Sequence, residues 1–154
     1  MNVFIISVGN KLNQWEHDGI DYYTKQISNQ LVINFIDIKG QQHPKRSLNE
    51  VLKLESEQIL KKIPKDSYIV SWDIKGKNIN SIELSEIFNH AMVDNLKICF
   101  VIGGSFGLSD EILRISDKTL SASSFTFPHR LFRIILVEQI YRAMSIINKS
   151  PYHK

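Results

Sequence analysis

The chain has 154 residues, which is enough for one domain with a sizeable apolar core. Hydrophobic residues make up 43% of it and charged residues 23%, a balance that excludes an intrinsically disordered protein, and the net charge is only +3. The one cysteine, Cys99, excludes a disulfide framework, and no stretch approaches about eighteen uninterrupted apolar residues. We therefore expect a cytoplasmic protein without a membrane span.

The chain opens with a strand-like segment that is followed by a helix-like one. Residues 2–8 are apolar and lack the basic lead-in of a signal peptide, so they predict a strand. Residues 11–27 have helical spacing, residues 31–38 predict a second strand, and residues 39–46 form a polar, basic loop. The residues that predict the buried stripe of the first helix are Leu12, Trp15, Ile20 and Tyr23.

A capping box marks the next helix. Ser47 and Glu50 predict its beginning, and Pro64 predicts its end. Residues 67–72 then predict a third strand, and residues 73–77 predict a turn after it.

The second half continues the alternation of helix and strand. Residues 81–93 predict a helix, and residues 96–102 are wholly apolar, as in a strand covered on both faces. A short helix from Ser109, a brief strand over 119–122 and a long helix over 129–148 follow. We therefore predict one domain over residues 1–154, an α/β fold with a mostly parallel sheet and helices on both faces.

A cluster of glycines ends the apolar strand. Gly103, Gly104 and Gly107 allow either a close approach of the backbone to a ligand or a tight turn before a helix. Ligands in open α/β sheets bind beyond the carboxyl ends of the strands, where this loop falls. The spacing matches neither a P-loop nor a dinucleotide fingerprint, so the loop alone leaves both readings open.

Residues 123–128 precede the last helix and combine small hydroxyl residues with a proline. This segment either lines a pocket or leads into the helix, with Ser124 or Thr126 as its cap. The helix itself is apolar on more than one face, which predicts contact with the sheet and with a partner subunit. Glu138 and Arg142 form either an i,i+4 ion pair or part of a functional site.

The C-terminal end of the chain is basic. From residue 128 onward five Lys or Arg residues face one acid, giving +4, so the preceding residues carry −1. This asymmetry favours a polyanionic partner, although a solvated helix face is the simpler alternative. The tail over 150–154 joins an aromatic, an imidazole and a cation, which either contact RNA or form a disordered end. His17, His43 and His90 have no metal-ligand spacing, so we expect no metal site.

Taken together, these segments resemble the RlmH (YbeA-like) family of SPOUT methyltransferases along nearly the whole chain. The residues that carry the resemblance are 100–104, 107–109, Thr126, Pro128, His129, Leu131, Arg133, Glu138, Gln139, 141–143 and 151–154. The resemblance implies a SPOUT-type α/β knot with a C-terminal deep trefoil knot, a homodimer and S-adenosyl-L-methionine as cofactor. It also implies methylation of N3 of a pseudouridine in a 23S rRNA stem-loop.

Matching positions imply the site residues. The expected cofactor-binding residues are Trp72, Gly103, Gly104, Ser123, Ser124, Phe125, Thr126, Phe127 and Pro128. The expected RNA-binding residues are His129, Arg130, Arg133 and Lys154, and the expected catalytic residues are Arg142, Tyr152 and His153. The chain departs from the family pattern at Trp72, where leucine is usual, and at Phe106, where an acid is common. Arg130 is an addition.

The expected chemistry requires N3, an imide nitrogen, to lose its proton as it attacks the methyl group. His153 would accept this proton or orient the base, Tyr152 would stack on the base, and Arg142 would stabilise charge on the carbonyl oxygens. The alternatives are a methyltransferase for another RNA such as tRNA, a non-catalytic ribosome-associated protein, and a phosphate-binding flavodoxin-like domain. Cofactor calorimetry and methylation assays on separate RNA fractions would distinguish them.

Overall fold

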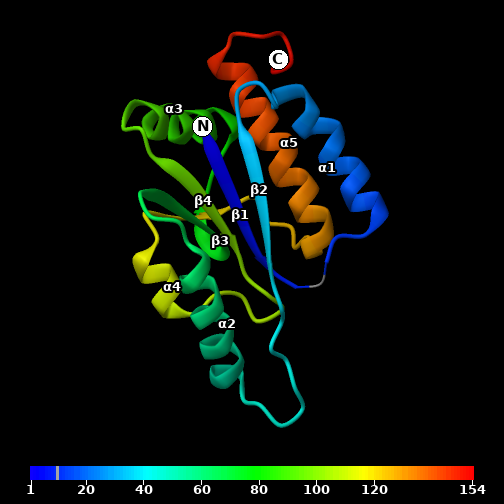
Figure 1. Cartoon of the computed structure of the whole chain (residues 1–154), viewed down its shortest axis with the longest axis vertical. Coiled ribbons are helices and arrows are strands. Elements are labelled where there is room, and N and C mark those ends of the chain that lie inside the picture. Colours follow the sequence, from blue (N-terminus) through cyan, green and yellow to red (C-terminus); the bar gives the residue numbers. More distant parts are fainter. Residues whose placement is uncertain (10) are drawn as a thin grey trace.

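The computed structural model describes residues 1–9 and 11–154, and a five-stranded sheet forms its centre. All neighbouring strands are parallel, in the order β2-β1-β4-β3-β5 (Figure 1). The strands are β1 (Asn2–Val8), β2 (Val32–Ile38), β3 (Ser67–Asn78), β4 (Lys97–Ile102) and β5 (Lys118–Ser121). The helices are α1 (Gln14–Ile27), α2 (Leu48–Lys62), α3 (Ser81–Val93), α4 (Asp110–Ile115) and α5 (His129–Ile147).

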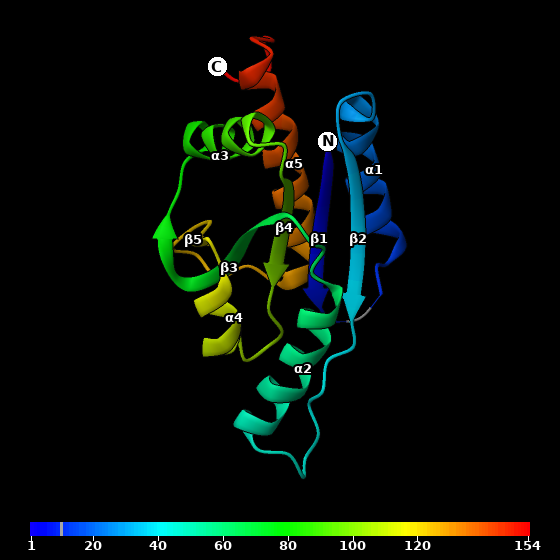
Figure 2. The same cartoon turned by 60° about the vertical axis from the view of Figure 1, so that its left-hand side comes forward.

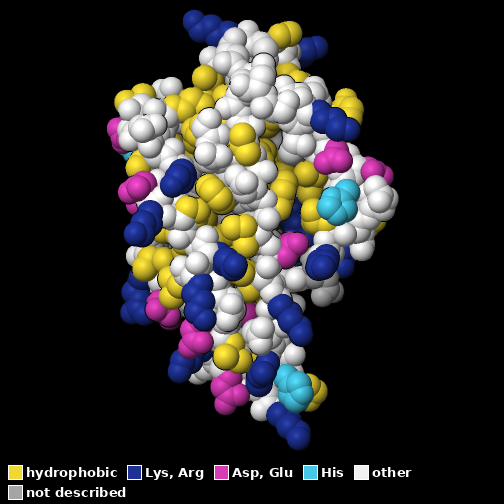
Figure 3. Space-filling model, viewed as in Figure 1, with side chains coloured by type: hydrophobic (Ala, Val, Ile, Leu, Met, Phe, Trp, Pro, Cys, Tyr) yellow, Lys and Arg dark blue, Asp and Glu magenta, His cyan; other side chains and the backbone are white. Residues whose placement is uncertain are grey.

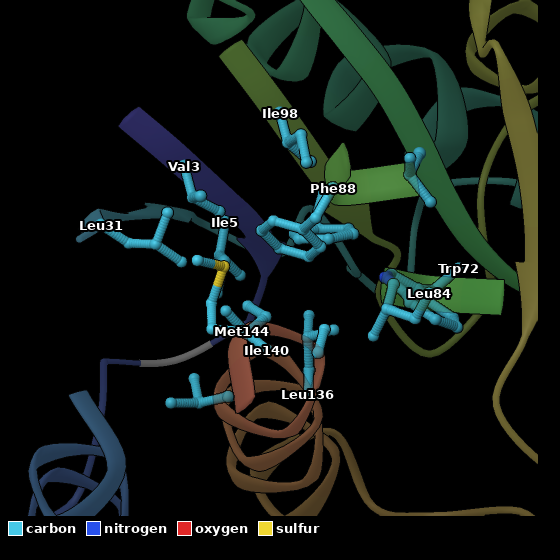
Figure 4. Close-up of a cluster of buried hydrophobic side chains, with 14 of the residues drawn as sticks. Val3, Ile5, Leu31, Trp72, Leu84, Phe88, Ile98, Leu136, Ile140 and Met144 are labelled. Carbon is cyan, nitrogen blue, oxygen red and sulfur yellow. The ribbon is translucent and has the colours of Figure 1, made fainter. Parts of the chain in front are cut away.

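Helices cover both faces of the sheet, as predicted (Figure 2). On one face, α1, α3 and α5 pack against the strands and build the larger core, in which Ile5, Phe88 and Ile140 are almost completely buried (Figure 4). On the other face, α2 and α4 contribute Ile59 and Ile112 to a smaller core that also buries Cys99. No helix in the described part of the chain has the length and apolar character needed to cross a membrane.

Most predicted elements are confirmed within a few residues. Both predicted capping features of α2 are present, since Ser47 accepts a hydrogen bond from the Glu50 backbone and Glu50 from that of Ser47. One residue of the predicted stripe of α1 is wrong: Trp15 is 49% exposed, whereas Ile20 is buried. The helix is instead buried through Ile20, Ile27 and the charged Glu16.

The predicted turn over residues 73–77 is also wrong, because these residues belong to β3. Trp72 and Lys77 both pair with Leu120 of β5, so β3 bulges around that residue. A Cβ at Gly76 would lie 2.5 Å from the Leu120 carbonyl carbon, and only glycine permits this approach. The expected knot stays a prediction.

Candidate active site

A cavity of about 420 Å³ opens beside the middle of β3, at the carboxyl end of β4 and beside the segment after β5. This volume lies within the range of small-molecule sites. Residues from three segments line it. They are 72–75, 102–108, Leu113, 120–123, 125–127, His129 and Phe132.

The loop after β4, residues 103–107 (the glycine loop), forms one wall of the cavity. Its backbone geometry requires its glycines. A Cβ at Gly103 would lie 2.5 Å from the backbone of Gly107, and Gly107 has a φ of 77°, which favours glycine. A Cβ at Gly104 would lie 3.0 Å from Val8 Cγ1 and 3.3 Å from Glu55 Oε2. The loop is therefore both a tight turn and a wall of the cavity, so the two readings left open by the sequence are compatible.

The segment after β5, residues 123–128, forms the opposite wall. Serine hydroxyl groups stabilise a turn in this segment. Ser123 Oγ accepts the Phe125 backbone N–H at 2.9 Å, and Ser121 Oγ donates to the Ser123 carbonyl at 3.1 Å. Ser123, Phe125, Thr126 and Phe127 line the cavity. Neither Ser124 nor Thr126 caps α5, because Pro128 occupies the N-cap and no side chain caps that end.

Two of the nine expected cofactor residues therefore lie outside the cavity wall. Ser124 and Pro128 do not line the cavity in the described structure, whereas Trp72, both strand-end glycines and the rest of the segment do. Trp72 packs edge-on against Phe132 with ring centroids 5.5 Å apart. Its buried indole N–H has no hydrogen-bond partner among the described residues, which leaves a donor at this wall.

The walls suit a cationic, partly aromatic ligand. Trp72 and Phe132 supply aromatic surface, and Asp73 supplies a carboxylate beside Gly107. Exposed backbone groups of the two loops can bind ribose and amino-acid groups. The sequence analysis missed Asp73 and Phe132. The position of Asp73 directly after residues 67–72, a predicted strand of a parallel sheet, was the signal that could have found it.

The expected catalytic residues Arg142, Tyr152 and His153 form a second cluster with Glu138, on α5 and the tail after it (the tail cluster). Arg142 Nη2 and Nε donate to Glu138 Oε1 at 2.6 and 3.0 Å, and Tyr152 Oη donates to the same oxygen at 2.9 Å. The Arg142 guanidinium lies 4.7 Å from the centroid of the Tyr152 ring, and its Nη1 lies 3.4 Å from His153 Nδ1. Tyr152 also packs on Tyr141, so the tail is folded onto the helix rather than disordered.

Burial favours the protonated form of Tyr152, and the carboxylate of Glu138 favours the protonated forms of both Tyr152 and Arg142. Burial, followed by the hydrogen bond to Glu138, raises the pKa of Tyr152 to about 12. The hydrogen bonds from Arg142 to the same carboxylate raise the pKa of the guanidinium. At neutral pH the phenol and the guanidinium therefore both act as hydrogen-bond donors.

The cavity and the tail cluster lie at opposite ends of α5 in one chain (Figure 1). His129, in the first turn of the helix, lines the cavity, whereas Arg142 is thirteen residues further along. At 1.5 Å per residue this separation is about 20 Å. The structure thus brings the cofactor residues together and the catalytic residues together, but it does not join the two sets within one chain.

The expected RNA-binding residues divide into three kinds. His129 lines the cavity, and Lys154 is exposed at the end of the tail. Arg133 is only 2% exposed, with its Nε donating to Ser7 Oγ at 3.0 Å and its Nη1 3.5 Å from Glu16 Oε2. Arg130 pairs with the same Glu16 carboxylate. We therefore no longer expect Arg133 to contact RNA, because its charge is buried against Glu16.

A larger hollow of about 660 Å³ lies between α1 and β2. Leu12, Ile20, Phe35 and Asp37 are among the residues that line it. It lies at the edge strand of the sheet, and none of the expected site residues reaches it. The smaller cavity is therefore the better candidate for the active site.

Comparisons with known proteins identify the family of the chain. The model of a family described as "Predicted SPOUT methyltransferase" matches residues 1–153. The chain is 40% identical to ribosomal RNA large subunit methyltransferase H of Clostridium botulinum (strain Alaska E43), with all of both chains covered. It is 42% identical to a protein of Methanococcus maripaludis named putative ribosomal RNA large subunit methyltransferase H, again over the full length of both.

A solved structure also resembles the fold. The crystal structure of a putative methylase family protein from Neisseria gonorrhoeae aligns with a TM-score of 0.51 and 16% sequence identity. The alignment covers 91% of this chain and 81% of that one. At this level of identity the similarity concerns the arrangement of helices and strands.

Proposed function

Since this chain belongs to the SPOUT methyltransferase family, we propose that it methylates N3 of a pseudouridine in a stem-loop of 23S rRNA. The observation that carries the proposal is the cavity beside the middle of β3 and the carboxyl end of β4. Its walls are the glycine loop and the segment after β5, the two segments expected to bind the cofactor. The full-length relatives named as large-subunit rRNA methyltransferases support the choice of RNA.

S-adenosyl-L-methionine fits the residues around this cavity. When bound, it supplies a methyl group on a positively charged sulfur, which makes the methyl carbon electrophilic. Trp72 and Phe132 would pack on its apolar parts, the backbone of the two loops would bind its polar groups, and Asp73 would balance its positive charge. The unpartnered indole N–H of Trp72 offers a further hydrogen bond to the ligand.

The tail cluster suits the uracil ring of the target. Arg142 Nη1 and His153 Nδ1 lie 3.4 Å apart, and in a hydrogen bond between them the imidazole nitrogen is the acceptor, because a guanidinium can only donate. His153 then carries its proton on Nε2 and can donate it in a hydrogen bond to a carbonyl oxygen of the base. This arrangement favours stabilising the charge that develops on uracil. For His153 to accept the N3 proton at Nδ1, its contact with Arg142 must first break.

The separation of the two clusters leads us to a composite site in a homodimer. Trp15, Tyr22 and Leu131 expose 49%, 66% and 40% of their surfaces on α1 and α5, which pack side by side. Large exposed apolar side chains on neighbouring helices are suited to a subunit interface. A two-fold axis across these helices would place the tail of one subunit over the cavity of its partner.

Mass spectrometry of rRNA nucleosides tests the reaction. Large subunits that lack the modification are incubated with the enzyme and labelled S-adenosyl-L-methionine, and we expect one labelled N3-methylpseudouridine in 23S rRNA. Label appearing only in tRNA would redirect the proposal to another RNA, and unlabelled RNA would contradict it.

A variant of one small residue tests the cofactor site. Ala122 is exposed and lines the cavity, so Ala122→Phe should fill the cavity and weaken binding of S-adenosyl-L-methionine at least about tenfold without unfolding the chain. The matched variant Lys118→Phe adds the same ring at an exposed position of β5 outside the cavity wall. Isothermal calorimetry that gives equal affinities for both variants would contradict this site.

A further inference from the structure

The loop between β2 and α2 (residues 39–46, the basic loop) is rich in positive charge. Lys39, Lys45 and Arg46 face no Asp or Glu within residues 39–49, and His43 lies among them. All four residues are exposed. Figure 3 shows basic side chains and a histidine, with some acidic side chains beside them, over the lower projection of the molecule, where Figure 1 places this loop. The loop therefore presents a positive surface, whereas Arg130 and Arg133 are paired with Glu16.

Hydrogen bonds hold this loop in a defined shape. Arg46 Nη1 donates to the Gln41 carbonyl at 2.9 Å, and its backbone N–H donates to the His43 carbonyl at 3.0 Å. The Lys45 backbone N–H donates to His43 Nδ1 at 3.1 Å. These bonds leave the ammonium groups of Lys39 and Lys45 on the outside of an ordered turn. A preorganised set of cations loses little conformational entropy when it binds an anion.

The loop is joined to the glycine loop of the cavity. Glu55 of α2 is 4% exposed, and its Oε1 accepts the Gln41 backbone N–H at 3.1 Å. The same carboxylate packs against Gly104, since a Cβ there would lie 3.3 Å from Glu55 Oε2. Burial raises the pKa of Glu55, although the hydrogen bond from Gln41 and the nearby His129 oppose this. The buried side chain of Glu55 thus fixes the basic loop relative to the glycine loop.

An aromatic residue separates the cavity from a second hollow. Phe106 is 49% exposed and lines both the cavity and a neighbouring hollow of about 260 Å³. The rest of this second hollow is formed by the basic loop and the start of α2, including His43, Arg46 and Leu48. An exposed ring beside a row of cations is the arrangement by which proteins stack a base and bind the adjoining phosphates.

We propose that Phe106 and the basic loop (residues 39–46) form an RNA-binding surface that holds the strand next to the target nucleotide. Phe106 stacks on a base beside the one that enters the cavity, and Lys39 and Lys45 bind the phosphates that follow. The surface rests on the proposed function, because it assigns a path for the RNA that this function requires. Continuity with the cavity and the uncompensated positive charge both favour RNA over a protein partner.

Two variants and a matched control test the surface. Lys39→Glu combined with Lys45→Glu should weaken binding of a 23S rRNA hairpin by roughly tenfold or more, and should lower the salt dependence by about one unit per lost phosphate contact. Phe106→Ala should weaken binding roughly tenfold with an unchanged salt dependence, and Phe106→Trp should restore it. The control, Lys65→Glu with Lys118→Glu, makes the same change of charge just before β3 and at the start of β5, away from the cavity.

Fluorescence anisotropy measures hairpin affinity, and steady-state kinetics on large subunits separates KM for RNA from kcat. We expect a raised KM for RNA in the test variants. The variant Lys39→Glu with Lys45→Glu should keep its kcat and its affinity for S-adenosyl-L-methionine. Loop variants that bind and react like the wild type would overturn this inference alone. Weaker binding to whole subunits with unchanged hairpin binding would overturn contact with the flanking strand. A wild-type enzyme inactive on 23S rRNA would overturn the proposed function and this inference with it.

Discussion

Two variants that are each inactive should restore methyl transfer when they share a dimer. The first, Ala122→Phe, fills the cavity and keeps the tail. The second, a chain that ends at Pro151, keeps the cavity and lacks Tyr152, His153 and Lys154. Each homodimer lacks one half of the proposed composite site on both subunits, so each should have only background activity.

The expected recovery follows from the geometry. The first turn of α5 lies at the cavity, and Arg142 is about 20 Å away along the helix, whereas reacting groups must approach to about 3–3.5 Å. In the proposed composite site, the tail of one subunit would complete the cavity of its partner. A mixed dimer then contains one complete site and one site that lacks both parts. Random assembly of equal amounts makes about half of the dimers mixed, which gives about one quarter of the wild-type activity.

The assay mixes the two variants under conditions that exchange subunits and follows transfer of labelled methyl groups to 23S rRNA. Circular dichroism of each parent confirms that both are folded, and mass spectrometry of intact dimers confirms that mixed dimers form. Activity near one quarter of the wild type supports the composite site. A population of mixed dimers that stays as inactive as its parents would refute the reasoning, because it would show that each cavity uses its own tail.

Three further substitutions test the packing around the site. Glu16→Leu removes the carboxylate that pairs with the buried Arg133 guanidinium, so it should lower the free energy of unfolding by about 3–5 kcal/mol in urea titrations. An unchanged urea midpoint would contradict this pairing. Burial raises the pKa of Glu55 above 4.5, so the free energy of unfolding of the wild type should fall relative to that of Glu55→Gln as the pH rises from about 4.5 to neutral. Parallel curves of the free energy of unfolding against pH would show that this carboxyl is not desolvated. Gly76→Ala should cost about 1–3 kcal/mol or more in thermal unfolding, since its Cβ would overlap the Leu120 backbone, and a wild-type melting temperature would contradict the close crossing of β3 and β5.

Much of the cofactor cavity could be predicted from the sequence because it is built from strand ends. In a parallel sheet, the loops that follow neighbouring strands gather at the same edge. The glycines at 103–107 could be placed at this edge from the pattern, whereas the segment at 123–128 was assigned to the same site by its resemblance to the family, and Ser124 and Pro128 lie outside the cavity wall. Trp72 was assigned to the site by the same resemblance, and the structure places it on the cavity wall.

The charge of the C-terminal segment was a poorer guide. Five Lys or Arg residues against one acid predicted a positive surface for RNA. In the folded chain, Arg130 and Arg133 meet Glu16, which is more than a hundred residues away in sequence. A net charge counted along the chain does not reveal these pairs, because ion pairs form between residues that are neighbours in space.

The type and order of the helices and strands follow from local pattern. Periodicity, capping boxes and the positions of glycine and proline act over a few residues, so strand β1 and helix α3 could be assigned from the amino-acid sequence with their observed limits. The order of the strands, the bulge of β3 around Leu120 and the burial of Arg133 arise only in the folded chain. Each depends on contacts between segments that are distant in sequence, whose free energy is decided by packing and desolvation in the assembled core. The separation of the tail from the cavity needs both levels: the length of α5 sets the distance of about 20 Å, and only the folded chain shows that the first turn of α5 lies at the cavity.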